Sequence, residues 1–243
     1  MKFVDLHLCL PIGDAERAER LIAKSAELGY SRIGVPLPPS VKEETVKPLR
    51  QISTELGLDF VTRLDLNPRS SGDLLVCLRK FRRSFEVVSV TCNSKAVARH
   101  AARDRRVDLL CFPSVEPRKR FFDRAEAQLA SESSAALEVN VAQILSSIEA
   151  KSNVAFLSRL RKEVAIAKSF DVPVVFSSGT SELLFLRKPQ DCAALALLFD
   201  VESSFALEAL STNPTAIIER NRARQSLDYA APGVRIVKEA RKP

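Results

Sequence analysis

Short apolar runs alternate along the chain with longer amphipathic segments. Each run is rich in Val, Ile, Leu and Phe, which is typical of strands buried on both faces of a parallel sheet. The starts of successive runs lie 22 to 36 residues apart, which leaves room for one helix between two strands. The predicted strands are Phe3–Leu10, Arg32–Leu37, Asp59–Leu66, Glu86–Cys92, Asp108–Ser114, Ala136–Val141 and Val172–Gly179.

The segments between the runs have the spacing of amphipathic helices. Asp14–Leu28 places Ala18, Leu21 and Ile22 on one stripe, and a glycine follows as a stop signal. Val41–Leu56 repeats this pattern and also ends at a glycine. The other predicted helices are Ser94–Arg103, Asn153–Phe170, Pro189–Phe199, Phe205–Leu210 and Thr215–Arg224.

Regular strand-then-helix units predict a parallel sheet with right-handed crossovers. Seven such units, or eight with an irregular C-terminal end, favour an α/β fold of the TIM-like (β/α) barrel type, with residues 1–243 as a single domain. Val234–Val237 is a candidate for a short closing strand. The alternative is a doubly wound sheet, but no Gly-x-Gly-x-x-Gly motif follows the first strand.

Charge and cysteine content indicate the kind of partner and the cellular compartment to expect. The net charge is +7, and a basic surface favours anionic partners such as nucleic acid, acidic lipid or an acidic protein. The five cysteines include no C-x-x-C pair and lie mostly in apolar runs, which predicts buried free thiols in a reducing cytoplasm. No apolar span of 18 residues is present, so we expect no membrane association.

The first strand carries the clearest candidate for metal chemistry. Asp5, His7 and Cys9 point to one face of a strand and resemble the D-x-H-x-H opening of the metal-dependent phosphoesterases of the polymerase-and-histidinol-phosphatase superfamily. The chain has two histidines in total, whereas a catalytic zinc needs about three protein ligands. We therefore predict no metal site, with Asp5 and His7 as weak candidates, and keep a metal-dependent phosphoesterase as the alternative function.

Two further features lie on predicted strands. Glu138 lies mid-strand, and pairing with Arg63 on another strand would place a buried ion pair in the barrel interior. Ser177, Ser178 and Gly179 follow the seventh strand at the predicted barrel mouth, where their backbone would either approach an anion or form a tight turn. Another barrel enzyme that holds a phosphorylated small molecule at this loop is a third hypothesis. No G-x-S-x-G, Walker or H-E-x-x-H motif is present.

Basic residues gather in several clusters along the sequence. Arginine suits phosphate because its planar fork can bond two oxygens at once. Clusters occur at Arg79–Arg83 and Arg103–Arg106, and three others contain the residues that we expect to bind RNA. These predicted RNA-binding residues are Arg118, Lys119, Arg120, Arg187, Lys188, Arg220, Arg222 and Arg224.

The last predicted strand and the helix after it carry a family resemblance. Val172–Thr180, Leu186–Asp191 and Ala193–Ala196 resemble the hallmark segment of ribonuclease P protein component 3, the archaeal relative of the eukaryotic 30-kilodalton subunit. Thr180 stands where the family usually has Ala, and many members carry another residue in place of His7. Weaker agreement extends to Phe3–Leu6, Thr62–Leu66, Leu137–Val139, Glu219–Arg222 and Pro232–Val234.

The resemblance implies a non-catalytic subunit with a TIM-like barrel. In that family the RNA cleaves the 5′ leader from precursor tRNA with Mg²⁺, and the protein binds no cofactor of its own. The implied partners are ribonuclease P RNA, protein component 2 and other ribonuclease P proteins, with precursor tRNA as the substrate of the holoenzyme. Carried over to this chain, Ser177, Ser178, Gly179, Arg187 and Arg220–Arg224 are the positions expected to matter for the fold or for contacts.

Overall fold

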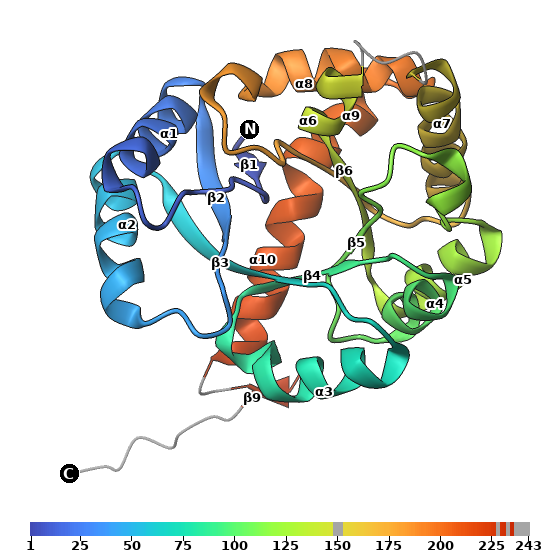
Figure 1. Ribbon diagram of the computed structural model, residues 1–243, viewed down its shortest axis with the longest axis horizontal. Helices are drawn as coiled ribbons and strands as arrows, with labels where there is room; N and C mark the ends of the chain where they lie inside the picture. Colours follow the sequence, from blue (N-terminus) through green and yellow to red (C-terminus); the bar gives the residue numbers. More distant parts are fainter. Residues whose placement is uncertain (148–152, 227–228, 232–233, 236–243) are drawn as a thin grey trace.

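The computed structural model describes residues 1–147, 153–226, 229–231 and 234–235. Its centre is a sheet of seven parallel strands in sequence order, surrounded by helices, which confirms the predicted TIM-like barrel (Figure 1). Neighbouring strands pair in order from the first to the seventh. The strands are β1 (Phe3–Asp5), β2 (Tyr30–Pro36), β3 (Asp59–Leu66), β4 (Val87–Thr91), β5 (Leu109–Cys111), β6 (Ala136–Asn140) and β7 (Val174–Ser177).

Four of the helices begin after a residue whose side chain caps the helix. Asp14, Ser70, Ser94 and Asp123 each accept a hydrogen bond from a backbone N–H in the first helical turn, which satisfies a group that the helix leaves unpaired. The helices are α1 (Ala15–Glu27), α2 (Glu43–Glu55), α3 (Ser71–Phe81), α4 (Lys95–Arg103), α5 (Arg124–Ser133), α6 (Val141–Ser147), α7 (Asn153–Ser169), α8 (Pro189–Ala196), α9 (Ser203–Leu210) and α10 (Thr212–Gln225), with 3₁₀ turns η1 (Arg82–Ser84), η2 (Pro117–Lys119), η3 (Leu183–Phe185) and η4 (Leu197–Phe199).

The barrel closes between the first and the last strand at its mouth. Regular pairing of the first strand ends at Asp5, earlier than predicted, and Leu8 then forms an isolated parallel bridge with Thr180. The Cys9 N–H donates to the Thr180 carbonyl at 3.0 Å, and the Gly179 N–H donates to the His7 carbonyl at 2.9 Å. The two ends of the sheet are therefore joined where the strands finish.

Helix α10 covers the opposite end of the barrel. It crosses behind the strands in Figure 1, and Ile217 and Ile218 are buried in an apolar cluster of their own. The other members of that cluster are strand residues, namely Val4, Leu6, Val61, Val87, Leu109, Ala136 and Val175. The Asn213 side chain also donates to the Val174 carbonyl at 2.9 Å. This helix therefore packs on the barrel end that the seven strands leave uncovered.

The predicted closing strand is wrong in its role. Val234–Arg235 forms a strand, β9, that pairs antiparallel with β8 (Tyr229–Ala231) in a separate two-stranded sheet and does not join the barrel. Residues 236–237 of the prediction lie outside the described residues. Within the described part of the chain, no helix is long and apolar enough to cross a membrane.

Candidate functional site

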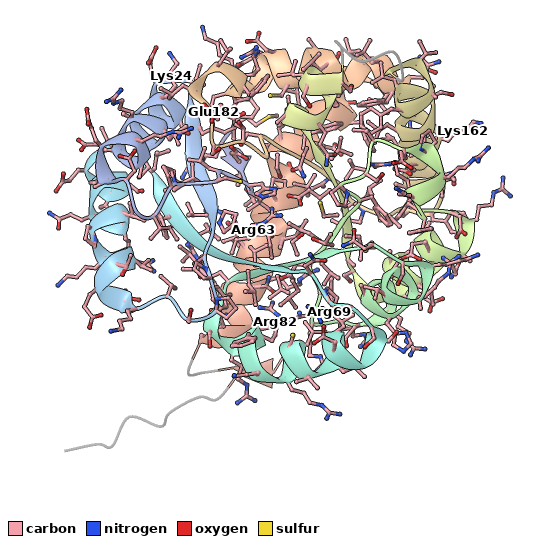
Figure 2. The ribbon with its side chains drawn as sticks, viewed as in Figure 1. Lys24, Arg63, Arg69, Arg82, Lys162 and Glu182 are labelled. Carbon is pink, nitrogen blue, oxygen red and sulfur yellow. The ribbon has the colours of Figure 1, made fainter. Side chains whose placement is uncertain are left out.

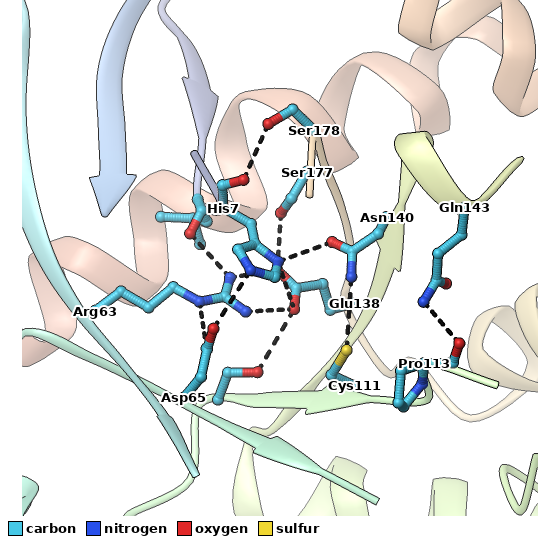
Figure 3. A network of polar contacts seen from close by, with 12 residues as sticks. His7, Arg63, Asp65, Cys111, Pro113, Glu138, Asn140, Gln143, Ser177 and Ser178 are labelled. Carbon is cyan, nitrogen blue, oxygen red and sulfur yellow. Dashed lines mark hydrogen bonds and ion pairs between the residues drawn. The ribbon is translucent and has the colours of Figure 1, made fainter. Parts of the chain in front are cut away.

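A polar network fills the barrel interior at the carboxyl ends of the strands (Figure 3). In a parallel barrel, alternate strand residues point inward, and the mouth is the usual place for chemistry. The network takes side chains from the extension of the first strand and from β3, β6 and β7, and Ser89 of β4 and Cys111 of β5 are hydrogen-bonded to it. Its charged and polar members are His7, Arg63, Asp65, Glu138, Asn140 and Ser177.

An ion pair between Arg63 and Glu138 lies at the centre, as predicted. Both side chains are completely buried, and two parallel hydrogen bonds join them, from Nη1 to Oε1 at 2.5 Å and from Nη2 to Oε2 at 2.7 Å. Burial alone would raise the pKa of Glu138, but the Arg63 charge outweighs it and holds that pKa below its usual value. Arg63 also donates to Asp65 at 2.6 Å and to the Leu6 carbonyl at 2.8 Å, so its donors have partners from three strands or their extensions.

His7 is placed to carry a proton on both ring nitrogens. Nε2 lies 3.3 Å from Asp65 Oδ2, and Nδ1 lies 3.0 Å from Asn140 Oδ1. Burial and the Arg63 charge lower the pKa of His7, but the hydrogen bonds with Asp65 and Cys9 and the Glu138 charge more than offset them and raise it to about 10. A doubly protonated imidazole has no lone pair for a metal ion.

The weak metal candidates have structural partners. Asp5 Oδ1 accepts from the backbone N–H of His7 at 3.0 Å and of Ser178 at 2.9 Å, so this carboxylate joins the first strand to the loop after β7. Among the described residues, no group of three or more His, Cys, Asp or Glu is arranged to hold a metal ion. The geometry therefore gives the phosphoesterase alternative no support.

The loop after β7 is occupied by closure of the barrel. The Ser178 and Gly179 N–H groups donate to Asp5 and to the His7 carbonyl, and the Ser178 hydroxyl donates to the same carbonyl at 2.9 Å. Gly179 has φ +64°, and a Cβ there would lie 2.7 Å from the Asn140 side chain. Because the amides of Ser178 and Gly179 already have acceptors, the tight-turn interpretation fits this loop. These N–H groups are not available to bind a phosphate, so the hypothesis of an enzyme that holds a phosphorylated small molecule here gains no support.

Of the three predicted RNA-binding residues on α10, two pair with carboxylates of the barrel and the third, among the described residues, does not. Arg220 contacts Asp108 at 3.0 Å, and Arg222 contacts both Asp59 at 2.7 Å and Glu86 at 2.6 Å. These carboxylates lie at or just before the starts of strands, so the two arginines fasten α10 to the barrel. Arg224 makes one long hydrogen bond, at 3.4 Å, to the Arg105 carbonyl.

The cluster around η2 is split between interior and surface. Arg120 is 3% exposed, its guanidinium is 2.6 Å from Glu163, and it lies near the Phe112 and Phe156 rings. Arg118 is exposed and lines a hollow of about 550 Å³ together with Lys162. Arg120 therefore belongs to the interior, and its guanidinium is not exposed for contact with RNA.

The remaining predicted cations lie on the surface in different surroundings. Lys119 pairs with Glu116 at 2.9 Å, and Lys188 is exposed at the start of α8. Arg187 turns back onto the carbonyls of Leu184 and Leu186. The structure thus places the predicted cations in three separate regions, around η2, before α8 and on α10.

The clusters Arg79–Arg83 and Arg103–Arg106 were recognised as basic but were not among the residues predicted to bind RNA. They precede β4 and β5, which are neighbours in the sheet, so arginines of both meet beside the C-terminal end of α10. Adjacency of the loops that precede successive barrel strands is the signal that could have linked them.

Comparisons with known proteins agree over almost the whole chain. The family model described as RNase P subunit p30 matches residues 2–226. Proteins named ribonuclease P protein component 3 from Methanothermobacter thermautotrophicus and Methanosarcina mazei are 29% and 30% identical, over 99% and 92% of this chain and 97% and 90% of their own. A chain in a cryo-EM structure of archaeal ribonuclease P with mature tRNA has the same fold, with a TM-score of 0.82 and 22% identity over 98% of this chain and 100% of that one.

Proposed function

This chain belongs to the RNase P subunit p30 family, and on that premise we propose that it serves ribonuclease P as a non-catalytic protein subunit that supports the catalytic RNA. The observation that carries the proposal is the family match over residues 2–226. The proposed partners are the ribonuclease P RNA, protein component 2 and the other ribonuclease P proteins. Precursor tRNA is the substrate of the assembled particle, which we place in the cytoplasm.

The physical role follows from charge on a rigid frame. Folding of an RNA brings phosphates together, and cations fixed on a barrel reduce their repulsion and release counterions. Such contacts position the RNA without reading its sequence. The chain has a net charge of +7, and Arg118 and Lys188 are exposed cations without an ion pair among the described residues. In this proposal Mg²⁺ is bound and used by the RNA, and the protein holds no cofactor.

Reconstitution tests the proposal. The chain is mixed with ribonuclease P RNA, precursor tRNA and the partner subunits, and 5′-leader removal is measured across a Mg²⁺ titration. The matched control omits only this chain. We expect the complete mixture to reach half-maximal cleavage at lower Mg²⁺ than the control, because protein cations replace part of the metal screening.

Two results would contradict this function. One is cleavage by the isolated chain with Mn²⁺ or Zn²⁺ that a chelator abolishes, since bond breaking would then belong to the protein. The other is identical Mg²⁺ dependence with and without the chain.

A further inference from the structure

A small pocket surrounded by arginines opens at the barrel end that carries α10. Its volume is about 190 Å³, and it lies where the C-terminal end of α10 meets the loops before β4 and β5. Figure 2 labels Arg82 beside that end of the helix. We call it the arginine pocket, lined by Arg82, Arg83, Arg105, Arg106, Arg224 and Asn221.

Positive charge in the arginine pocket exceeds negative charge. Arg106 pairs with Asp104 at 2.6 Å, and Arg82 lies 3.2 Å from Asp108, which Arg220 also contacts. Arg83 and Arg105 are exposed and have no ion pair among the described residues. Burial first, and then the Arg224 and Arg220 charges, lower the pKa of Arg82 against the opposing effect of Asp108. Like charges held this close favour an anion between them.

Asn221 gives a second and independent sign of a ligand. It is completely buried and lines the pocket, yet neither its Nδ2 nor its Oδ1 has a hydrogen-bond partner among the described residues. An unpaired amide in the interior costs free energy, and buried polar groups nearly always have a partner. A bound oxyanion would accept from Nδ2 while the guanidinium groups bond its other oxygens, whereas Oδ1 is an acceptor and gains no partner from an anion.

We propose that the arginine pocket binds a phosphate of an RNA backbone. This deepens the proposed function, on which it rests, by assigning one contact with the RNA to the α10 end of the barrel. A backbone phosphate fits better than a free ion because the two unpaired arginines are exposed at the surface and can meet the phosphates on either side. A phosphate contact of this kind fixes position without sequence preference.

The first test removes the two unpaired arginines. The Arg83→Ala/Arg105→Ala variant, in complex with its partner subunits, is titrated with ribonuclease P RNA at several salt concentrations. We expect weaker binding and a slope of log K against log salt that is smaller in magnitude by about 2, as for loss of the contacts with the two flanking phosphates.

The matched control removes two exposed arginines from the mouth end, in the variant Arg69→Ala/Arg124→Ala, where neither guanidinium has an ion pair among the described residues. It changes net charge equally and should keep the wild-type slope. An equal loss in both variants, or no loss in either, would overturn the pocket. If the wild-type complex assembled with this chain binds RNA no better than one lacking it, the proposed function itself fails.

The second test separates binding from stability. We expect Asn221→Leu to keep or raise the Tm, because it removes an unpaired buried amide, and to weaken RNA binding several-fold. Inorganic phosphate serves as the probe for a free-ion site. If phosphate raises the Tm of the wild type, while Asn221→Leu and the Arg83→Ala/Arg105→Ala variant bind RNA as tightly as wild type, the pocket holds a small anion and the RNA proposal is wrong.

Discussion

At the scale of single residues, charges inside the barrel mouth are balanced. Arg63 and a protonated His7 face Glu138 and Asp65, so two cations meet two anions in one connected network. Charges taken out of water are tolerated when they are paired and hydrogen-bonded, and breaking such a pair leaves an uncompensated charge. The network therefore fixes the position of several strands relative to one another.

Removal of the central carboxylate should destabilise the fold. We expect Glu138→Ala to lower the free energy of unfolding by about 3–5 kcal/mol, because Arg63 then keeps a buried charge with Asp65 alone. Urea denaturation measures the change. The double variant Arg63→Met/Glu138→Leu is the control, and it should lose less than the single variant. A loss above that of Glu138→Ala would argue against this account of the pair.

The charge on His7 makes stability depend on pH in one direction. The folded-state pKa of about 10 lies above the unfolded value of about 6.5. Its contribution is therefore fully present below about pH 6.5 and is lost as the pH rises toward 10, by at most about 1.4 kcal/mol per pH unit. We expect this decline in wild type and a flatter profile in His7→Gln, measured by denaturation from pH 5 to 9.5. Parallel profiles would mean that His7 is neutral in the folded protein.

At the scale of elements, the strands were predictable and the position of the last helix was not. Continuous apolar runs identified β2 to β7, because a parallel strand is buried on both faces. The helical pattern of Thr215–Arg224 was also correct, since it lies within α10. Nothing in that pattern says that Ile217 and Ile218 face the end of a barrel, because the apolar stripe of a helix does not identify the surface it packs on.

A sequence pattern does not show which distant element a residue contacts, and this decides which parts of the candidate site were predictable. Arg63 and Glu138 both lie within apolar strands, so a buried ion pair between them was the plainest interpretation of the sequence, and the structure confirms it. Burial of Arg120 could not be predicted from the sequence, because its partner Glu163 comes from helix α7, far along the chain. The arginine pocket required three segments to meet, and only the folded barrel brings them together.

Helix α10 should contribute strongly to stability through its buried face. We expect Ile218→Ala to lower the free energy of unfolding by about 2–5 kcal/mol, because Ile218 is fully buried among strand residues at the barrel end. Glu219→Ala on the exposed side of the same helix is the control and should change it by no more than about 0.5 kcal/mol. Similar small losses in both variants, measured by thermal and urea denaturation, would show that α10 is only loosely attached.

At the scale of the whole molecule, the arginines fall into two groups, those paired with carboxylates and those exposed without an ion pair among the described residues. Several arginines serve the fold, as Arg63, Arg120 and Arg222 do, and each of these touches a carboxylate. Others, such as Arg83, Arg105 and Arg118, are exposed without an ion pair among the described residues. The net charge of +7 does not show which cations a partner can meet. Many arginines are paired with carboxylates of the same chain, and only the unpaired exposed ones are available for an anionic partner.

The place of α10 also affects how the protein is made. A ribosome releases the chain from its N-terminus, and domains generally fold as units during or after synthesis. All seven barrel strands precede residue 178, but the helix that covers their open end finishes only at Gln225. A nascent chain that has emerged as far as β7 would still expose Val4, Val61 and Val175 to water. Premature termination in this interval should therefore yield an aggregation-prone product that chaperones recognise.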